Sequence, residues 1–171
     1  MASDKKLQKI KRIPFEVKNA IGSLAKGNIH KVKNKPISEY SDGLCHRNVK
    51  KHVEQCGGEQ LYGWVLSNLK AYIENGLYIW AFHSVWRETK ERMPINVNNV
   101  AGLEKSKFII FWEDRLRSYN FEEDMSYNNI FVLSNEKKKW AFEQQFKMEI
   151  EVGVAYWHSE NLAKDIGSSS G

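Results

Sequence analysis

Cysteine is scarce in this chain: only two stand among 171 residues, and they are eleven positions apart. Two cysteines cannot make the disulfide framework that stabilises many small secreted domains. The N-terminus has no apolar segment of the kind found in signal peptides, because Leu7 and Ile10 are isolated among lysines. We therefore expect a reduced protein in the cytoplasm.

Long apolar runs are also missing. The most apolar windows, residues 77–85 and 108–112, are far shorter than the roughly 20 residues of a membrane-spanning helix. We expect no transmembrane segment and no membrane partner. The sequence likewise has no Cys-x-x-Cys motif, no glycine-rich phosphate loop and no Gly-x-Ser-x-Gly motif, and we expect no cofactor.

Positive charge is concentrated near the N-terminus. Residues 1–36 hold ten Lys or Arg against two acidic residues, a net charge of +8, whereas the remaining residues carry −3. Such an arm can attract nucleic acid, an anionic surface or an acidic partner, although solvated lysines at a terminus are commoner than a specific site. We expect an amphipathic helix inside it, beginning near Pro14 and ending by Gly27.

A chain of this length has the size of one domain. We expect the basic arm over residues 1–36, a single domain over residues 37–166, and a flexible tail over residues 167–171. The stretch 28–42 mixes Gly, Asn, Pro and Ser signals with lysines and is interpreted as a loop.

Periodicity indicates an α+β domain. A helix is predicted over residues 45–56, where Gly57-Gly58 ends it, and two β-rich runs, 60–69 and 77–87, form a predicted hairpin. Further strands are predicted over 95–100, 107–112 and 130–133, and a helix over 134–152 that 154–162 continues. We expect an antiparallel sheet packed against the helix that starts at Cys45, with flanking N- and C-terminal helices.

Cys45 is placed where a turn becomes the first turn of a helix. Unpaired backbone N–H groups there stabilise a thiolate and can bind an oxyanion. A histidine follows at His83 in a strand-like run, and an imidazole nearby could generate the thiolate. The third group must accept the other N–H of the ring: Asn96 and Asn98 share one strand face, and Asp114 is a further contender.

Four short motifs follow one another in the chain: Cys45-His46-x-Asn48-Val49, Gly57-Gly58, Gly63-Trp64 and His83-Ser84-Val85-Trp86. In this combination, residues 42–100 resemble small bacterial and phage proteins that look papain-like or transglutaminase-like. In that superfamily a cysteine opens a helix packed on an antiparallel sheet, and a histidine and an Asp or Asn lie on the strands that follow. The resemblance implies that Cys45 is the nucleophile, His83 the base and Asn96 the orienting residue.

This constellation predicts a cysteine-dependent hydrolase or acyl transferase that acts on an amide or ester bond of a protein, peptide or small substrate. The backbone N–H of Cys45 is the expected oxyanion donor. Gln60 and Trp64 are candidates for a second donor, and Trp64 and Trp86 for lining a substrate cleft, although the tryptophans also suit a core.

Three other interpretations compete with this one. A buried free cysteine is often only a small hydrophobe. A metal cluster that includes both cysteines is excluded, because Cys45 and Cys56 would stand about 16 Å apart along a helix and cannot share an ion. A smaller site using His52, Cys56 and the distant His158 stays open as an alternative, although we expect no metal. Finally, the chain could be an inactive bacterial or phage binding protein or inhibitor that engages a nucleotide, nucleic acid or protein. It would then tolerate Cys45→Ala but be sensitive to charge reversal at Lys5, Lys6, Lys9 and Lys11.

Overall fold

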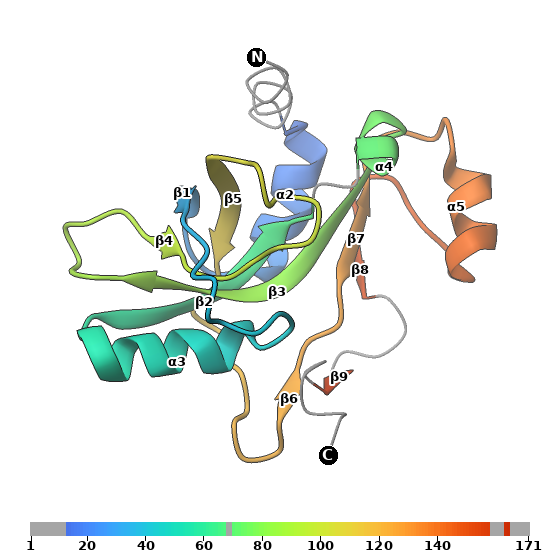
Figure 1. The fold of residues 1–171 in the computed structure, drawn as a ribbon. Helices are drawn as coiled ribbons and strands as arrows, with labels where there is room; N and C mark the ends of the chain where they lie inside the picture. Colours follow the sequence, from blue (N-terminus) through green and yellow to red (C-terminus); the bar gives the residue numbers. More distant parts are fainter. Residues whose placement is uncertain (1–12, 68–69, 158–162, 165–171) are drawn as a thin grey trace.

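A closed five-stranded barrel forms the centre of the protein in a computed structural model that describes residues 13–67, 70–157 and 163–164 (Figure 1). The strands follow the order β2-β5-β1-β4-β3, and β3 pairs back to β2, which closes the barrel. All of these pairings are antiparallel except that of β1 with β4. The strands are β1 (Ile29–Asn34), β2 (Glu59–Leu66), β3 (Leu77–Arg87), β4 (Ile95–Asn96) and β5 (Phe108–Glu113).

The long strand β3 also carries an extension of the sheet. Its first residues, 77–80, pair with β7 (Ile130–Leu133), and β7 pairs in turn with β8 (Ala155–Trp157). A separate two-stranded ribbon joins β6 (Met125–Ser126) to β9 (Ala163–Lys164). The barrel and the extension are therefore continuous through one strand.

Four helices surround the strands in the described part of the chain. Figure 1 shows α3 below β2 in this view and α5 at the opposite side of the molecule, beyond β7 and β8. α3 packs against β2 and β3, and α2 packs against β7 and β8. The helices are α2 (Phe15–Leu24), α3 (Cys45–Cys56), α4 (Lys70–Glu74) and α5 (Lys139–Phe146).

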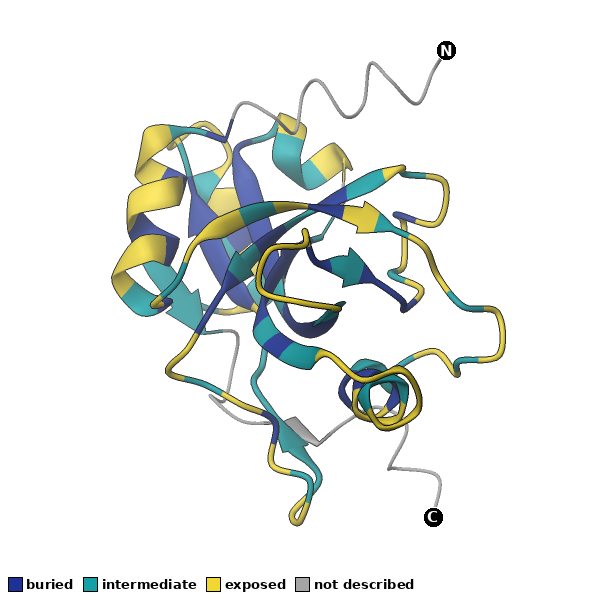
Figure 2. Ribbon diagram, turned by 90° about the vertical axis from the view of Figure 1, so that its left-hand side faces the viewer, coloured by how far each residue is buried: buried dark blue, intermediate teal, exposed yellow. Residues whose placement is uncertain are grey.

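Both faces of β3 are covered, which explains why the sequence of this strand is apolar on both. Ala81 and Val85 face a cluster inside the barrel, whereas Trp80 and Phe82 face a second cluster that includes Val17 of α2. A third cluster fills the space between the extension and α5. Figure 2 shows buried positions concentrated on the strands and exposed positions along the outer sides of the helices.

The expected α+β class is confirmed, and so are a helix over residues 45–56 and antiparallel pairing of the two runs that became β2 and β3. The sheet itself differs from the expectation, because it closes into a barrel and contains one parallel pair. The predicted loop over 28–42 is wrong in its first part. β1 lies there, so this part of the expected N-terminal arm is built into the barrel.

Two expectations near the C-terminus also need correction. The helix predicted over 134–152 is limited to α5, and the segment expected to continue it contains the strand β8. α5 ends at Lys147, which has a left-handed backbone conformation with φ of 52°. The tail at residues 167–171 and the first twelve residues of the basic arm lie outside the described residues.

Candidate active site

The start of α3 is fastened to the middle of β3. His46 Nδ1 lies 2.5 Å from Ser84 Oγ, and the side chain of Gln60 donates from Nε2 to both the His46 carbonyl, at 2.9 Å, and Ser84 Oγ, at 3.0 Å. These contacts join the dipeptide Cys45-His46 to the dipeptide His83-Ser84. Ser84 lies with Phe82 on the outer face of β3, whereas His83 lies on the inner face, so these contacts fasten the start of α3 to the outside of the strand that carries the predicted base.

His83 lies on the face of β3 that is turned toward the barrel interior, between Ala81 and Val85. Its Nε2 is 2.8 Å from Asn96 Oδ1, and both side chains are buried. The structure therefore brings His83 together with Asn96, the first of the three candidates for the orienting residue.

The orientation of the Asn96 amide follows from its other neighbours. Asn96 Nδ2 donates to the Asn98 carbonyl at 2.7 Å and to Asn34 Oδ1 at 2.8 Å. A carbonyl can only accept, so the nitrogen of Asn96 must face Asn98 and the oxygen must face His83. Asn96 Oδ1 also accepts from the backbone N–H of Asn98 at 3.3 Å.

Asn34 is fixed in the same way. Its Nδ2 donates to the carbonyls of Leu103 and Ser106, both at 2.9 Å, which leaves Oδ1 to accept from Asn96. The proton on His83 must then lie on Nε2, because the atom it meets is an acceptor. In the neutral ring Nδ1 is consequently the proton acceptor, which is the state that a general base requires.

Burial keeps both histidines of the site neutral. Burial lowers the pKa of His83 to about 4, although the hydrogen bond to Asn96 acts in the opposite direction. Burial, and then the charge that His83 would carry, lowers the pKa of His46 to about 3. His46 is stacked on Tyr119, with ring centroids 4.7 Å apart, so this ring serves as a packed anchor beside the site.

Cys45 is the first residue of α3 and is half-buried. Its carbonyl accepts from Asn98 Nδ2 at 3.3 Å, and Asn98 Oδ1 accepts from Asn48 Nδ2 at 2.8 Å. Leu44, at the N-cap position, makes no side-chain capping bond to the helix. Burial, together with the charge of an ionised Cys45, raises the pKa of Tyr62, which places this tyrosine within electrostatic range of the sulfur.

The other two orienting candidates have different partners. Asn98 connects α3 to the loop after β4 through Asn48 and Cys45. Asp114 is buried directly after β5, on the other edge of β2 from β3. It accepts hydrogen bonds there from Trp64 Nε1 at 3.0 Å and from Arg117 at 2.8 Å. Burial raises the pKa of Asp114, but these and two backbone hydrogen bonds outweigh it and hold the pKa below its ordinary value.

The three residues expected to bind substrate lie in structural positions. Gln60 holds His46 and Ser84, as described above. Trp64 is fully buried against Phe82 and is a core residue in this structure. Trp86 donates from Nε1 to the Gly57 carbonyl at 2.8 Å and packs on His52, so it supports the far end of α3.

The described residues contain no group of three His, Cys, Asp or Glu side chains that could hold a metal ion. His52 Nδ1 lies 2.8 Å from the hydroxyl of Tyr40, and Cys56 is exposed at the other end of α3 from Cys45. His158, the third residue of the considered metal site, lies outside the described part of the chain.

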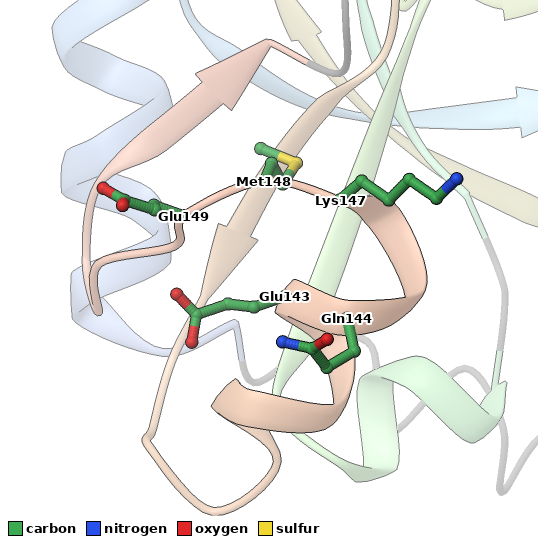
Figure 3. Close-up of a pocket in the computed structure, with 5 residues that line it drawn as sticks. All are labelled: Glu143, Gln144, Lys147, Met148 and Glu149. Atoms are coloured by element: carbon green, nitrogen blue, oxygen red, sulfur yellow. The ribbon is translucent and has the colours of Figure 1, made fainter.

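An open pocket of about 300 Å³ lies beside α5 and is lined by Glu143, Gln144, Lys147, Met148 and Glu149 (Figure 3). α5 packs near Leu77, at the start of β3. His83 is six residues further along this strand, about 20 Å away at 3.4 Å per residue. This pocket is therefore separate from the surroundings of Cys45.

Sequence reasoning missed the polar side chains that hold the candidate residues in place. His46 and Ser84 stand directly beside Cys45 and His83 in the chain, so their adjacency was the available signal. Asn34 was not found, because it lies in a stretch interpreted as a loop and its partners are 62 to 72 residues away.

None of the helices in the described part of the chain combines the length and the hydropathy that a bilayer-spanning segment needs. Comparison of the chain with protein-family models, with curated proteins and with solved structures gives no match.

Proposed function

We propose that this protein is a cysteine-dependent hydrolase or acyl transferase of papain-like or transglutaminase-like arrangement, acting on an amide or ester bond. Cys45 is the nucleophile, His83 the general base and Asn96 the residue that orients the imidazole. The main support is the hydrogen bond between His83 Nε2 and Asn96 Oδ1, since the fixed amide leaves Nδ1 as the proton acceptor.

The chemistry proceeds in two halves. His83 Nδ1 takes the proton of the Cys45 thiol, and the sulfur attacks the substrate carbonyl carbon to give a tetrahedral intermediate. The carbon–nitrogen or carbon–oxygen bond then breaks, and the imidazolium gives its proton to the leaving amine or alcohol. The thioester on Cys45 is released by water, an amine or a thiol, which His83 deprotonates in turn.

The start of α3 is the proposed oxyanion site. Backbone N–H groups of its first turn point toward the N-terminal end, where the helix dipole favours negative charge. Leu44 has an apolar side chain and occupies none of these donors. Negative charge that develops on the carbonyl oxygen would therefore be stabilised next to Cys45.

The low pKa of His83 predicts how the activity depends on pH. A general base must be unprotonated, and the pKa of His83 is about 4. We expect the acidic limb of the kcat/KM profile near pH 4, well below the 6.5 of an ordinary histidine. A hydrolysis or transfer assay between pH 3.5 and 8 measures this limb, and a midpoint near 6.5 would contradict the assignment of His83.

The proposed chemistry agrees with a reducing compartment, and we place the protein in the cytoplasm for that reason. A reactive thiol is preserved there, whereas oxidation would remove the nucleophile. A protein, peptide or small amide is the proposed substrate class.

The first experiment is alkylation of the thiols with iodoacetamide between pH 4 and 9, with the adducts located by mass spectrometry. We expect fast modification of Cys45 well below the ordinary thiol pKa of about 8.5, and loss of this fast phase in His83→Ala. Cys56 serves as an internal control in each sample, because it is exposed and lies at the other end of α3.

Two results would contradict the proposal. One is modification of Cys45 that is slower than, or equal to, that of Cys56 at every pH. The other is a fast phase that persists unchanged in His83→Ala. Either result would favour the alternative, a binding protein in which Cys45 is structural.

A further inference from the structure

A row of lysines runs along the outside of the barrel on β1. Lys31 and Lys33 are exposed, whereas Val32 between them is buried inside the barrel. Lys35 follows after the end of the strand, and its backbone N–H still bonds to the Asn96 carbonyl at 2.9 Å. Because alternate residues of a strand point to one side and are about 7 Å apart, the three lysines extend over about 14 Å.

The neighbouring strand adds an aromatic ring and more positive charge. Phe108 of β5 is opposite Lys33, and Lys31 Nζ lies 4.2 Å from the centroid of its ring. Lys107 is exposed and its carbonyl accepts from the Asn34 N–H at 2.9 Å, which puts it next to the same end of β1. We name the set of Lys31, Lys33, Lys35, Lys107 and Phe108 the β1 lysine face.

Carboxylates do not neutralise this face in the described part of the chain. None of the ion pairs between described residues involves one of its lysines. Glu104 is in the turn before β5 and accepts from the Gly102 N–H at 3.1 Å. Glu113, at the far end of β5, lies 3.3 Å from His30 and 3.6 Å from Arg115.

We propose that the β1 lysine face binds single-stranded nucleic acid. The lysines pair with successive phosphates of the nucleic-acid backbone. An unpaired base stacks on the Phe108 ring once the flexible Lys31 side chain has turned from the ring to a phosphate. A linear row on the flank of a barrel suits an extended polyanion, and lysines beside an aromatic ring provide both parts of single-strand recognition. A duplex would offer the phosphates but no unpaired base.

This proposal is independent of the chemistry at Cys45. It concerns the outer surface of β1, whereas Asn34 on the same strand points inward to Asn96. It also differs from binding by the first residues of the basic arm, because every residue of the face is described. Strand pairing places Lys31, Lys33 and Phe108, and backbone hydrogen bonds at the end of β1 place Lys35 and Lys107.

The test measures binding of fluorescein-labelled dT20 and U20 oligonucleotides to the full chain by anisotropy, from 25 to 300 mM NaCl. The variant Lys31→Glu/Lys33→Glu/Lys35→Glu is compared with Lys50→Glu/Lys51→Glu/Lys90→Glu. The control triple has the same change in net charge at exposed positions, and Lys50 also lies over an aromatic ring, that of Phe121, at 4.6 Å. Circular dichroism melting checks that both variants fold.

We expect at least a tenfold loss of affinity in the face variant, and a loss of less than threefold in the control. The slope of log K against log salt should be smaller by about 2 in the face variant, because three phosphate contacts are removed. In Phe108→Leu we expect weaker binding with an unchanged salt slope, since only stacking is lost.

Three results would overturn the proposal. One is no binding of either oligonucleotide by the unaltered protein at 25 mM NaCl. Another is an equal loss in the two triple variants, which would mean that net charge or the basic arm controls binding. The third is binding to vesicles of phosphatidylserine and phosphatidylcholine, sensitive to the face variant, without binding to the oligonucleotides.

Discussion

The side-chain amide of Asn96 has one orientation that satisfies all of its neighbours. Its nitrogen meets two acceptors, the Asn98 carbonyl and Asn34 Oδ1, and its oxygen meets the Nε2–H of His83. An aspartate in this position would stabilise the imidazolium better, but its second oxygen would face two other oxygens. Asparagine is therefore the residue that this arrangement of neighbours requires.

From this we predict the effect of Asn96→Asp. The pKa of His83 should rise above about 4, because a carboxylate favours the charged ring. At pH 7 the free energy of unfolding should fall by about 1 to 3 kcal/mol, the cost of leaving a buried acceptor without a donor. NMR titration of the His83 ring and urea unfolding measure the two effects. A variant as stable as the unaltered protein would show that the amide orientation is not decisive.

A second prediction at this scale concerns acid stability. Below pH 6.5 the unfolded chain binds protons at His83 and His46, whereas the folded protein binds them only near pH 4 and pH 3. The free energy of unfolding should therefore fall as the pH drops from 6.5 to 4, by about 3 kcal/mol from His83 alone. Urea unfolding at several pH values measures this slope. It should be shallower in His83→Gln, and an unchanged slope would contradict the buried neutral state of His83.

At the scale of elements, the turn between α3 and β2 depends on two glycines with different constraints. Gly57 has φ of 75° and ψ of −162°, but a Cβ atom there would meet nothing within 4 Å. Gly58 has φ of 82°, and a Cβ atom there would be 2.5 Å from the Arg87 carbonyl oxygen and 2.7 Å from Trp86 Nε1. Gly57 is therefore needed only for its positive φ, whereas Gly58 is needed both for its positive φ and for the close approach of β3.

We therefore expect Gly58→Ala to be more destabilising than Gly57→Ala. Gly57→Ala should lower the free energy of unfolding by about 1 to 3 kcal/mol, the range for a strained backbone conformation. Gly58→Ala adds a clash with the backbone of β3 and should cost more than this. Urea unfolding of the two variants decides the order, and equal losses would mean that β3 moves away at little cost.

Sequence periodicity predicts some of these helices and strands and misses others. α3 was found because its apolar and polar residues alternate at helical spacing between a turn and two glycines, and β3 because its apolar residues form a long strand-like run. β1 was missed because its outer face carries lysines and only Val32 is fully buried, so its composition looks like that of a loop. α5 was extended too far because apolar residues continue beyond it without forming a helix.

At the scale of the whole molecule, closure of the barrel depends on Gly63. This residue of β2 is paired with His83 of β3 on one side and with Glu113 of β5 on the other. A Cβ atom there would be 2.6 Å from Phe111 Cζ and closer still to the Trp112 carbonyl oxygen. A side chain of any size would therefore push β5 away from β2.

We predict that Gly63→Ala lowers the free energy of unfolding by more than about 3 kcal/mol, because both strand packing and backbone hydrogen bonds are disturbed. Gly57→Ala is the matched control, since it adds the same methyl group in open space. Hydrogen exchange of the β2 and β5 amides reports whether the loss lies at this seam. A variant with stability near that of Gly57→Ala would show that the barrel accommodates the methyl group.

Closure could not be predicted from the sequence for a physical reason. The sequence of a strand shows which of its faces is apolar, but it does not show which other strands will pair with it. The partners can lie far away in the chain, as β4 and β5 do from β1. The candidate site shows the same division. The order of Cys45, His83 and Asn96 could be predicted from residue types, whereas Asn34 enters the site only because β1 returns beside β4.

The pairings between strands that are far apart in the sequence also determine when this chain can fold. β1 ends at Asn34, yet its partners β4 and β5 begin only at Ile95 and Phe108, and β5 also pairs with β2. Such distant contacts make folding slow, in the millisecond to second range for comparable β-rich topologies. During synthesis β1 therefore remains without partners until β4 and β5 have left the ribosome, and fragments that end before residue 113 lack a complete β5 and should not fold.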